Sequence, residues 1–234
     1  MFNQLGVMCR AQNADEAFKF WWDLLSTGAE EEQLDSRDGE VVGEFLNAVT
    51  IINDPTRNFM SNPIRKMSVR YTVGELAWYL SGKRDLHSIG LITKAWERFS
   101  DDGKNVNSNY GYCIKEKYGF DQWDYVVDLL RKHPDSRQAV IHIKEPRNTP
   151  SKDVNCTVSL QFFIRDCKLY MTTYMRSNDL WMGFPFDVFQ FTFMQMLMAM
   201  ELGVDLGTYT HIAGSLHLYR RDYEIGKKRE EEAE

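Results

Sequence analysis

The segment from Asp153 to Asp187 constrains the fold more than any other part of the chain. It contains two runs of β-branched and aromatic residues, TVSLQFFI and KLYMTTYM, joined only by Arg165, Asp166 and Cys167. Strand-length runs separated by a few turn residues predict a β-hairpin. A cysteine precedes the first run, and the stretch Arg-Ser-Asn-Asp follows the second. Because strand ends can present polar groups without burying unpaired charge, the segment predicts a functional site.

Composition and charge limit the class of protein. A chain of 234 residues, 43% hydrophobic and 26% charged, is predicted to form one soluble globular domain over residues 1–234. The net charge of −6 argues against a general nucleic-acid or anionic-membrane surface, although it is compatible with a local phosphate pocket. The N-terminus lacks an apolar signal region and no apolar run reaches membrane-spanning length, which predicts a cytoplasmic protein.

Cysteine is the strongest candidate nucleophile in this sequence, because no GxSxG signature is present. The four cysteines are too few and too irregularly spaced for a disulfide scaffold, and none forms a CxxC pair that would favour a metal site. A reactive thiolate needs a lowered pKa. Arg176, twenty residues after Cys156 on the adjacent predicted strand, is expected to supply that charge and to bind a phosphate bidentately.

The expected secondary structure mixes helices and strands, with no repeats and no linker. Capping residues and apolar spacing predict helices over 13–25, 72–80, 121–132 and 188–201, the last one buried and ended by Gly203. Besides the hairpin, strands are expected over 41–52, 139–143, 208–212 and 215–219. Residues 30–39 are expected to form a loop, and the charged residues 226–234 a frayed tail. This pattern predicts a single α+β domain.

Seven short motifs carry a resemblance to a known family. They are residues 74–80 (GELAWYL), 107–111 (NSNYG), 134–137 (PDSR), 155–157 (NCT), 175–179 (MRSND), 183–187 (GFPFD) and 216–219 (LHLY). In order and spacing they resemble the thymidylate synthase superfamily over roughly residues 34–222. Within that superfamily the chain looks most like the phage-type deoxycytidylate hydroxymethylases.

The resemblance implies a fold and an activity. The fold would be a thymidylate synthase-like α+β domain, in which helices pack on a mixed β-sheet and one sheet face forms a homodimer. The enzyme would use 5,10-methylenetetrahydrofolate as co-substrate, without a metal. The expected reaction converts dCMP, methylenetetrahydrofolate and water to 5-hydroxymethyl-dCMP and tetrahydrofolate, as in phage DNA modification.

The resemblance also implies four catalytic residues. Cys156 is expected to add to carbon 6 of the pyrimidine and so make carbon 5 nucleophilic toward the methylene carbon. Glu75 is expected to organise water and protons around the base and the folate, and Tyr110 to assist proton removal from carbon 5. Asp187 is expected to read the base and to exchange a proton with its ring nitrogen.

Two sets of residues are implied to bind the ligands. The nucleotide set holds the 5′-phosphate, the base and the 3′-hydroxyl, and it consists of Arg37, Arg176, Ser177, Asp187, His217 and Tyr219, with Arg137 reaching in from a second subunit. The folate set consists of Glu75, Trp78, Trp96, Asp179 and Gly183.

Several positions depart from the pattern of the synthases. Asp187 stands where they have the pyrimidine-reading asparagine. Cytosine presents an amino donor and a ring-nitrogen acceptor, so a carboxyl that shares a proton pairs with it, whereas asparagine suits uracil. Thr157 replaces a histidine, Gln138 replaces an arginine of the phosphate site, and the polar Asp153 replaces an apolar residue. With no recognisable closing tail after Tyr219, the site is expected to admit water and form the hydroxymethyl product.

Other functions are considered beside this one. Within the same fold, the chain is compatible with a dCMP methyltransferase, a CMP hydroxymethylase or a thymidylate synthase acting on dUMP. A non-catalytic nucleotide-binding relative would keep only the fold. The joint presence of Cys156, Arg176, Asp187, His217 and Tyr219 argues against it, because a pure binder has no use for the thiol.

Overall fold

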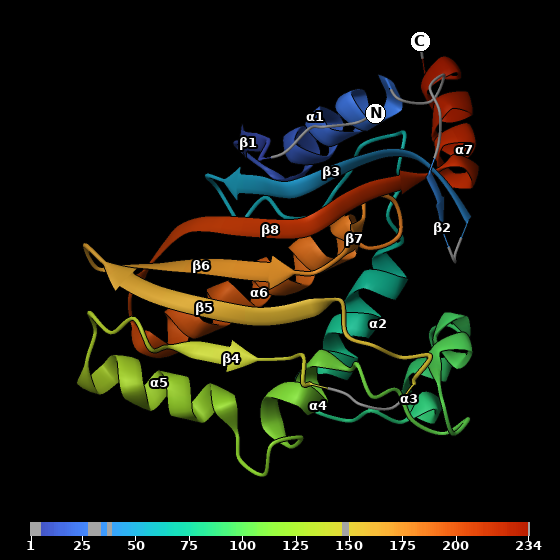
Figure 1. The fold of residues 1–234 in the computed structure, drawn as a ribbon. Coiled ribbons are helices and arrows are strands. Elements are labelled where there is room, and N and C mark those ends of the chain that lie inside the picture. The colour runs from blue at the N-terminus through green and yellow to red at the C-terminus, as the bar shows by residue number, and fades with distance from the viewer. Residues whose placement is uncertain (1–5, 28–33, 37–38, 147–149, 234) are drawn as a thin grey trace.

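A mixed β-sheet forms the centre of the molecule. The structure, a computed structural model, describes residues 6–27, 34–36, 39–146 and 150–233. The strands run in the order β1-β3-β8-β6-β5-β4, with β2 paired to β3 and β7 paired to β8 (Figure 1). Their bounds are β1 Met8–Ala11, β2 Leu34–Ser36, β3 Gly39–Ile52, β4 Val140–His142, β5 Thr157–Arg165, β6 Lys168–Met175, β7 Asn178–Asp179 and β8 Asp205–Tyr219.

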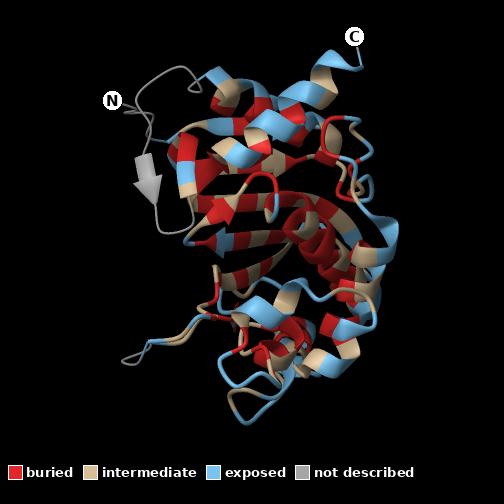
Figure 2. Ribbon diagram, turned by 90° about the vertical axis from the view of Figure 1, so that its right-hand side faces the viewer, coloured by how far each residue is buried: buried red, intermediate tan, exposed pale blue. Residues whose placement is uncertain are grey.

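Helices cover one face of this sheet and leave the other face open (Figure 2). The helices are α1 Ala14–Ser26, α2 Val69–Leu80, α3 Leu86–Gly90, η2 Ala95–Phe99, α4 Tyr110–Lys115, α5 Gln122–Lys132, α6 Phe184–Leu202 and α7 Arg220–Glu231. On β6, Leu169 and Met171 point into the core under α6, whereas Tyr170 and Tyr174 alternate onto the open face. The period-two burial explains why one face is apolar core and the other is not.

The predicted hairpin and three of the predicted helices are confirmed. β5 and β6 pair antiparallel from Thr157 opposite Met175 to Arg165 opposite Lys168. The two turn residues, Asp166 and Cys167, have φ of 50° and 56°, the left-handed pair that a tight hairpin turn requires. Asn13 and Asp121 cap α1 and α5, and Gly203, at φ 68°, ends α6. Within the described residues, no helix, including the apolar α6, is both long and apolar enough to cross a membrane.

The prediction for the start of α2 is wrong. The helix expected from Thr72 begins earlier, at Val69, and the Ser68 hydroxyl caps it by accepting from the Tyr71 N–H. Thr72 lies inside the helix, where its hydroxyl donates to the Ser68 carbonyl at 2.8 Å. Glu75 is therefore not committed to a cap, and its carboxyl turns into the protein.

The two strands predicted after residue 207 form one continuous strand. β8 pairs with β3 from Ile52 opposite Tyr209 to Val41 opposite Tyr219, and this long partner holds it extended through Gly214. A Cβ at Gly214 would lie 2.9 Å from the Arg176 carbonyl oxygen, so glycine permits a close approach rather than a break. The expected loop at 30–39 also contains β2, which pairs with β3.

The expected frayed tail is instead part of a docked helix. α7 continues to Glu231 and packs on the molecule opposite residues that are far away in sequence. The Arg229 guanidinium donates to the Ile64 and Arg65 carbonyls at 3.1 and 3.2 Å, and Gly226 lies buried against Trp22 and Trp181. These long-range contacts order a segment whose own composition is only charged.

Replacing Gly226 by alanine tests this docking. A Cβ there would lie 2.2 Å from Trp22 and 2.8 Å from Trp181, so Gly226→Ala is expected to destabilise the fold by about 1–3 kcal/mol. Urea unfolding measures the change. If this part of α7 were frayed, Gly226→Ala would instead raise the free energy of unfolding, because alanine favours a helix over glycine by about 1 kcal/mol. Gly90→Ala is the control, since nothing lies within 4 Å of its Cβ position.

Candidate active site

Residues from five separate elements meet at one end of the sheet. Cys156 directly precedes β5, and Arg176 directly follows β6. Asp187 lies in the first turn of α6, Tyr110 begins α4, and Glu75 is in α2. These elements converge where β5 begins and β6 ends, on the right of Figure 1. The sequence-predicted catalytic residues thus share one site.

Arg176 contacts the candidate nucleophile. Its Nη2 lies 3.6 Å from the Cys156 Sγ, while Nε and Nη2 donate to the carbonyls of Asn155 and Val154 at 3.1 Å each. The guanidinium lowers the pKa of the thiol, as predicted, but burial has the larger effect. The net pKa of Cys156 is raised above its usual value, helped by the charge of Asp187. The expectation of a lowered thiol pKa is therefore wrong for the protein without substrate.

Asp187 is a buried carboxyl held by two donors. The Tyr110 hydroxyl donates to its Oδ1 at 3.1 Å, and the Asn178 amide donates to its Oδ2 at 2.8 Å. Burial and the nearby charge of Glu75 raise the pKa of Asp187 to about 7. The Thr157 hydroxyl in turn donates to the Tyr110 oxygen at 2.9 Å. Asp187 can therefore offer either a proton or a lone pair near neutral pH.

Glu75 is the second buried carboxyl. It accepts from the Tyr71 hydroxyl at 2.6 Å and from the Gln190 amide at 3.1 Å. Burial raises the pKa of Glu75 to about 7, although these hydrogen bonds oppose the shift. Two carboxyl groups that titrate near neutrality within one site suit proton transfer.

Two tryptophan rings, Trp78 and Trp96, lie beside Glu75 and are called the aromatic wall below. The rings of Trp78 and Trp96 lie 5.4 Å apart between centroids, and the indole of Trp96 helps to lower the pKa of Glu75. The Trp78 indole N–H is buried and has no hydrogen-bond partner among the described residues. An unsatisfied buried donor beside a carboxyl fits a planar ligand that brings its own acceptors.

The predicted sugar-binding residues lie together at the end of β8. The rings of His217 and Tyr219 meet edge to face at 5.0 Å between centroids. The Ser215 hydroxyl lies 3.3 Å from the His217 Nδ1. β7 pairs with β8 here and places Asp179 opposite His217, so the strand that follows Arg176 and Ser177 joins the two halves of the nucleotide set.

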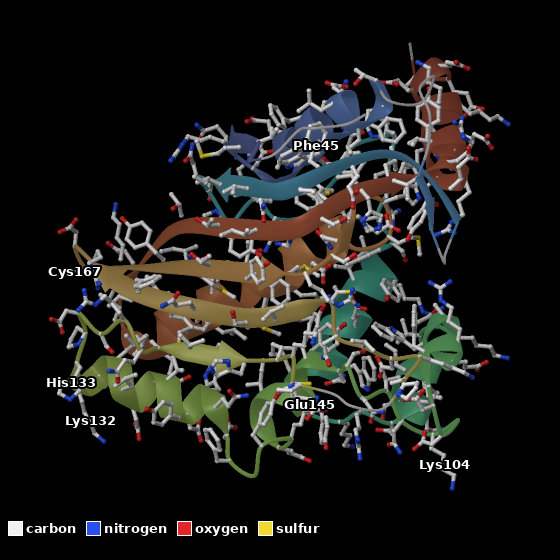
Figure 3. The ribbon with its side chains drawn as sticks, viewed as in Figure 1. Phe45, Lys104, Lys132, His133, Glu145 and Cys167 are labelled. Carbon is white, nitrogen blue, oxygen red and sulfur yellow. The ribbon has the colours of Figure 1, made fainter. Side chains whose placement is uncertain are left out.

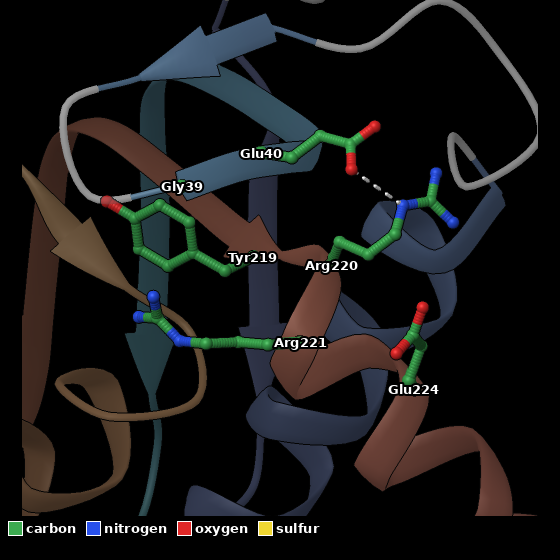
Figure 4. A pocket seen from close by; sticks show the side chains of 6 residues that line it. All are labelled: Gly39, Glu40, Tyr219, Arg220, Arg221 and Glu224. Carbon is green, nitrogen blue, oxygen red and sulfur yellow. Dashed lines mark ion pairs between the residues drawn. The ribbon is translucent and has the colours of Figure 1, made fainter.

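A pocket of about 250 Å³ opens beside Tyr219 (Figure 4). It is lined by Gly39, Glu40, Tyr219, Arg220, Arg221 and Glu224. The Arg221 guanidinium lies over the Tyr219 ring at 4.5 Å, and Arg220 Nε forms an ion pair with Glu40 at 3.4 Å. The predicted phosphate ligand Arg37 lies outside the described residues, two positions before Gly39.

Arg137 does not join this site. It is exposed and lies before β4, where Val140 pairs opposite Gln161 and the Gln161 amide donates to the Arg137 carbonyl. This register places Arg137 toward the hairpin turn, at the far end of β5 from Cys156. Figure 3 labels Cys167 and His133 at that end of the sheet. The side chain therefore cannot reach Arg176 or Cys156 of its own chain.

Two predicted folate residues have clear local roles. Asp179 accepts from the backbone N–H groups of Trp181 and Met182 at 2.7 and 3.1 Å, which fixes the turn into α6. At Gly183, a Cβ would lie 2.8 Å from the Asn178 Nδ2 and 3.2 Å from the Asp187 Oδ2. Glycine at this position therefore lets the amide reach the carboxyl.

Sequence reasoning gave no role to four residues of the site. They are Tyr71 and Gln190, which bond Glu75, and Asn178 and His211, which lie behind Asp187. His211 is buried, with its imidazole Nε2 3.0 Å from the Asn178 amide oxygen. Its period-two spacing with Tyr209 and Ala213 on β8 was an available signal of burial.

The comparisons with known proteins agree with this architecture. The family model for thymidylate synthase matches residues 20–232. A deoxyuridylate hydroxymethyltransferase of Bacillus phage SP01 is 32% identical in an alignment over 220 residues that covers 88% of this chain and 57% of the relative. The chain thus spans little more than half of that relative's length. The crystal structure of thymidylate synthase from T4 phage matches with a TM-score of 0.75 at 22% identity, over 90% of this chain and 79% of that chain. The predicted thymidylate synthase-like fold, with helices packed on a mixed sheet, is confirmed, and the chain belongs to the thymidylate synthase family.

Proposed function

We propose that the protein is a folate-dependent transferase that adds a one-carbon unit to carbon 5 of a pyrimidine nucleoside monophosphate. The observation that carries the proposal is the meeting of Cys156, Arg176 and Asp187 at one end of the sheet, with the arginine 3.6 Å from the thiol. A nucleophile, a phosphate-binding cation and a buried side chain that reads the base are three groups that this chemistry uses.

The covalent step assigns one role to each of these residues. The Cys156 thiolate forms a bond to carbon 6 of the base, and the electron pair of the 5,6 double bond moves to carbon 5. Arg176 stabilises the thiolate as it forms, since its charge lowers the pKa of the thiol. Once the one-carbon unit is joined to carbon 5, loss of the carbon 5 proton with assistance from Tyr110 breaks the bond between that unit and the tetrahydrofolate nitrogen and leaves an exocyclic methylene on the ring. Water then adds its oxygen to this methylene carbon, and the electron pair returned to the ring restores the 5,6 double bond and expels the Cys156 thiolate.

The preferred substrate in this proposal is dCMP. The Asp187 carboxyl can accept from the 4-amino group and share a proton with the ring nitrogen, because its pKa lies near 7. Arg176 and Ser177 bind the 5′-phosphate, together with Arg37 and a partner's Arg137, and His217 and Tyr219 bind the 3′-hydroxyl.

The aromatic wall fits the folate co-substrate. Trp78 offers a buried N–H that lacks a partner among the described residues, and Trp96 lies against it beside Glu75. Asp179 and Gly183 lie just before the first turn of α6, which carries Asp187. Methylenetetrahydrofolate supplies the one-carbon unit at the oxidation level of formaldehyde, and water supplies the hydroxyl oxygen of a 5-hydroxymethyl product. Glu75 organises that water and the protons around it.

A second candidate is the hydroxymethylation of dUMP. It is favoured by the relative that is 32% identical and is named a deoxyuridylate hydroxymethyltransferase. Incubating the protein with methylenetetrahydrofolate and either nucleotide, labelled with tritium at carbon 5, separates the two candidates. Tritium release from dCMP with a hydroxymethylated product supports the first proposal, and release from dUMP alone supports the second. Binding without release from either nucleotide would identify a non-catalytic relative.

We further propose that the protein works as a homodimer through the open sheet face. The half-buried aromatics Phe163 and Tyr170 pair across β5 and β6 on that face, and Tyr174 is 39% exposed beside them. Aromatic residues on a sheet face without covering helices suit an interface. A twofold partner on this face would also bring its Arg137 to a phosphate site that the chain's own Arg137 cannot reach.

Subunit mixing tests the shared site. Arg137→Ala and Cys156→Ala are each expected to be inactive as homodimers. In a mixed dimer, one of the two sites has an intact thiol and receives Arg137 from the other subunit, so mixing the two variants is expected to restore part of the activity. Tritium release measures the recovery, and mass spectrometry of the intact dimers confirms exchange. A mixture that exchanges subunits but stays inactive would contradict the assignment of Arg137 to the partner.

A further inference from the structure

A buried chain of hydrogen bonds continues behind Asp187. The Tyr209 hydroxyl lies 2.9 Å from the His211 Nδ1, and the His211 Nε2 lies 3.0 Å from the Asn178 Oδ1. The Asn178 Nδ2 then donates to the Asp187 Oδ2 at 2.8 Å. Tyr209, His211 and Asn178 are at most 2% exposed. These three side chains, called the Asn178 chain below, connect the base-reading carboxyl to the middle of the sheet.

The Asn178 chain has two self-consistent directions. In the first, Tyr209 donates to Nδ1 of His211, the Nε2–H donates to the Asn178 oxygen, and the Asn178 amide donates to Asp187. In the second, the donor and acceptor of every bond are exchanged, and the Asp187 carboxyl must donate its own proton to the Asn178 oxygen. The imidazole carries a single N–H in both, because burial lowers the pKa of His211 to about 3. Only the first direction leaves the Asp187 proton available to a base.

The first direction also decides which oxygen of the Asp187 carboxyl is the donor and which is the acceptor. Oδ2 accepts the shorter bond, 2.8 Å from the Asn178 amide, whereas Oδ1 accepts from Tyr110 at 3.1 Å. The stronger bond favours the carbonyl character of Oδ2 and places the proton on Oδ1. Without this difference between its oxygens, a neutral carboxyl could carry its proton on either one. Such a carboxyl would pair equally well with a 4-amino and a 4-oxo pyrimidine, because the two bases present their hydrogen-bond donor and acceptor in opposite order.

We propose that Asn178, His211 and Tyr209 are positioning residues that fix the donor and acceptor order of Asp187 and thereby select between 4-amino and 4-oxo pyrimidine nucleotides. This inference rests on the proposed function for its ligand. Gly183 supports it, because a Cβ there would lie 2.8 Å from the Asn178 Nδ2 and would displace the amide. His211 is held from the side by the Phe184 ring, edge to face at 5.4 Å between centroids.

The direction of the chain can be measured in the wild-type protein without substrate. Nitrogen-15 NMR of labelled histidine is expected to show His211 as the neutral tautomer with its proton on Nε2, unchanged between about pH 5 and 8. The tautomer with its proton on Nδ1, or a titration near pH 6.5 like that of a solvent-exposed histidine, would overturn the inference. This measurement does not depend on what the protein catalyses.

Variants of His211 test the effect on selectivity. His211→Leu removes the donor to Asn178 and is expected to change the dCMP-to-dUMP ratio of kcat/KM by about tenfold or more. His211→Gln keeps an N–H donor, so its dCMP-to-dUMP ratio of kcat/KM is expected to stay within about threefold of the wild-type ratio. Tyr209→Phe leaves the imidazole without its fixed tautomer, and a smaller change in the same direction is expected.

Gln195→Leu is the matched control. Gln195 is also buried on α6 and donates to carbonyls of Leu169, Gly207 and Thr208, away from Asp187. Its loss is expected to lower the melting temperature without changing the nucleotide ratio. If wild type turns over a nucleotide and His211→Leu keeps the wild-type ratio, the inference is wrong and the proposed function stands. If wild type neither binds nor turns over either nucleotide, the proposed function is wrong, and so is the selectivity assigned to the Asn178 chain.

Discussion

Cys156→Ala is expected to lower turnover by about 10³-fold or more, which corresponds to about 4 kcal/mol in the activation barrier. The variant removes the atom that bonds to carbon 6, and none of the other groups in the site can replace it. Nucleotide binding is expected to persist, because Arg176, His217 and Tyr219 are unchanged. Tritium release from carbon 5 measures the first effect, and calorimetric titration with the nucleotide measures the second.

Cys167→Ala is the control for this prediction. Cys167 is an exposed thiol in the hairpin turn, at the far end of β5 from Cys156, and its replacement is expected to leave turnover unchanged (Figure 3). If Cys156→Ala retained more than about a tenth of the activity, a barrier change of less than ~1.4 kcal/mol, a different residue would have to be the nucleophile.

Asp187→Asn is expected to reverse the choice of nucleotide. Wild type is expected to prefer dCMP over dUMP by about 10⁴-fold, because a site built to bond one polar edge rejects the opposite edge. In the variant, the amide nitrogen in the place of Oδ2 donates to the 4-oxo group and to the Asn178 oxygen, with the Asn178 chain in its second direction. The amide oxygen in the place of Oδ1 accepts from the ring N–H of uracil. The overall rate falls as well, because the proton that neutralises the activated ring leaves with the carboxyl.

Steady-state kcat/KM on both nucleotides, for wild type and variant, measures the reversal. Asp222→Asn is the control: Asp222 is a buried carboxyl on α7 whose pKa is also raised by burial, and its replacement is expected to leave the nucleotide ratio unchanged. A wild-type protein that prefers dUMP would show that Asp187 does not read cytosine. The candidate favoured by the deoxyuridylate relative would then replace dCMP as the proposed substrate.

Local sequence patterns determined the elements that carry their own signals. The hairpin of β5 and β6 follows from two β-branched runs around a short turn, and α1 and α5 follow from their caps. The thymidylate synthase motifs also identified the fold and placed Cys156, Arg176, Asp187, Tyr110 and Glu75 in one site. Such features are readable because the responsible residues are neighbours in the chain or lie in short motifs that resemble those of the family.

Tertiary structure decided what depends on residues distant in sequence. The charged end of the chain becomes the docked helix α7 because Gly226 packs against Trp22 and Trp181 and because Arg229 donates to the Ile64 and Arg65 carbonyls. The thiol of Cys156 has a raised pKa because burial outweighs the arginine beside it, and no sequence pattern states how deeply a side chain is buried. The Asn178 chain likewise joins β7, β8 and α6 through hydrogen bonds of about 3 Å. Distances of that kind arise only when the sheet has assembled.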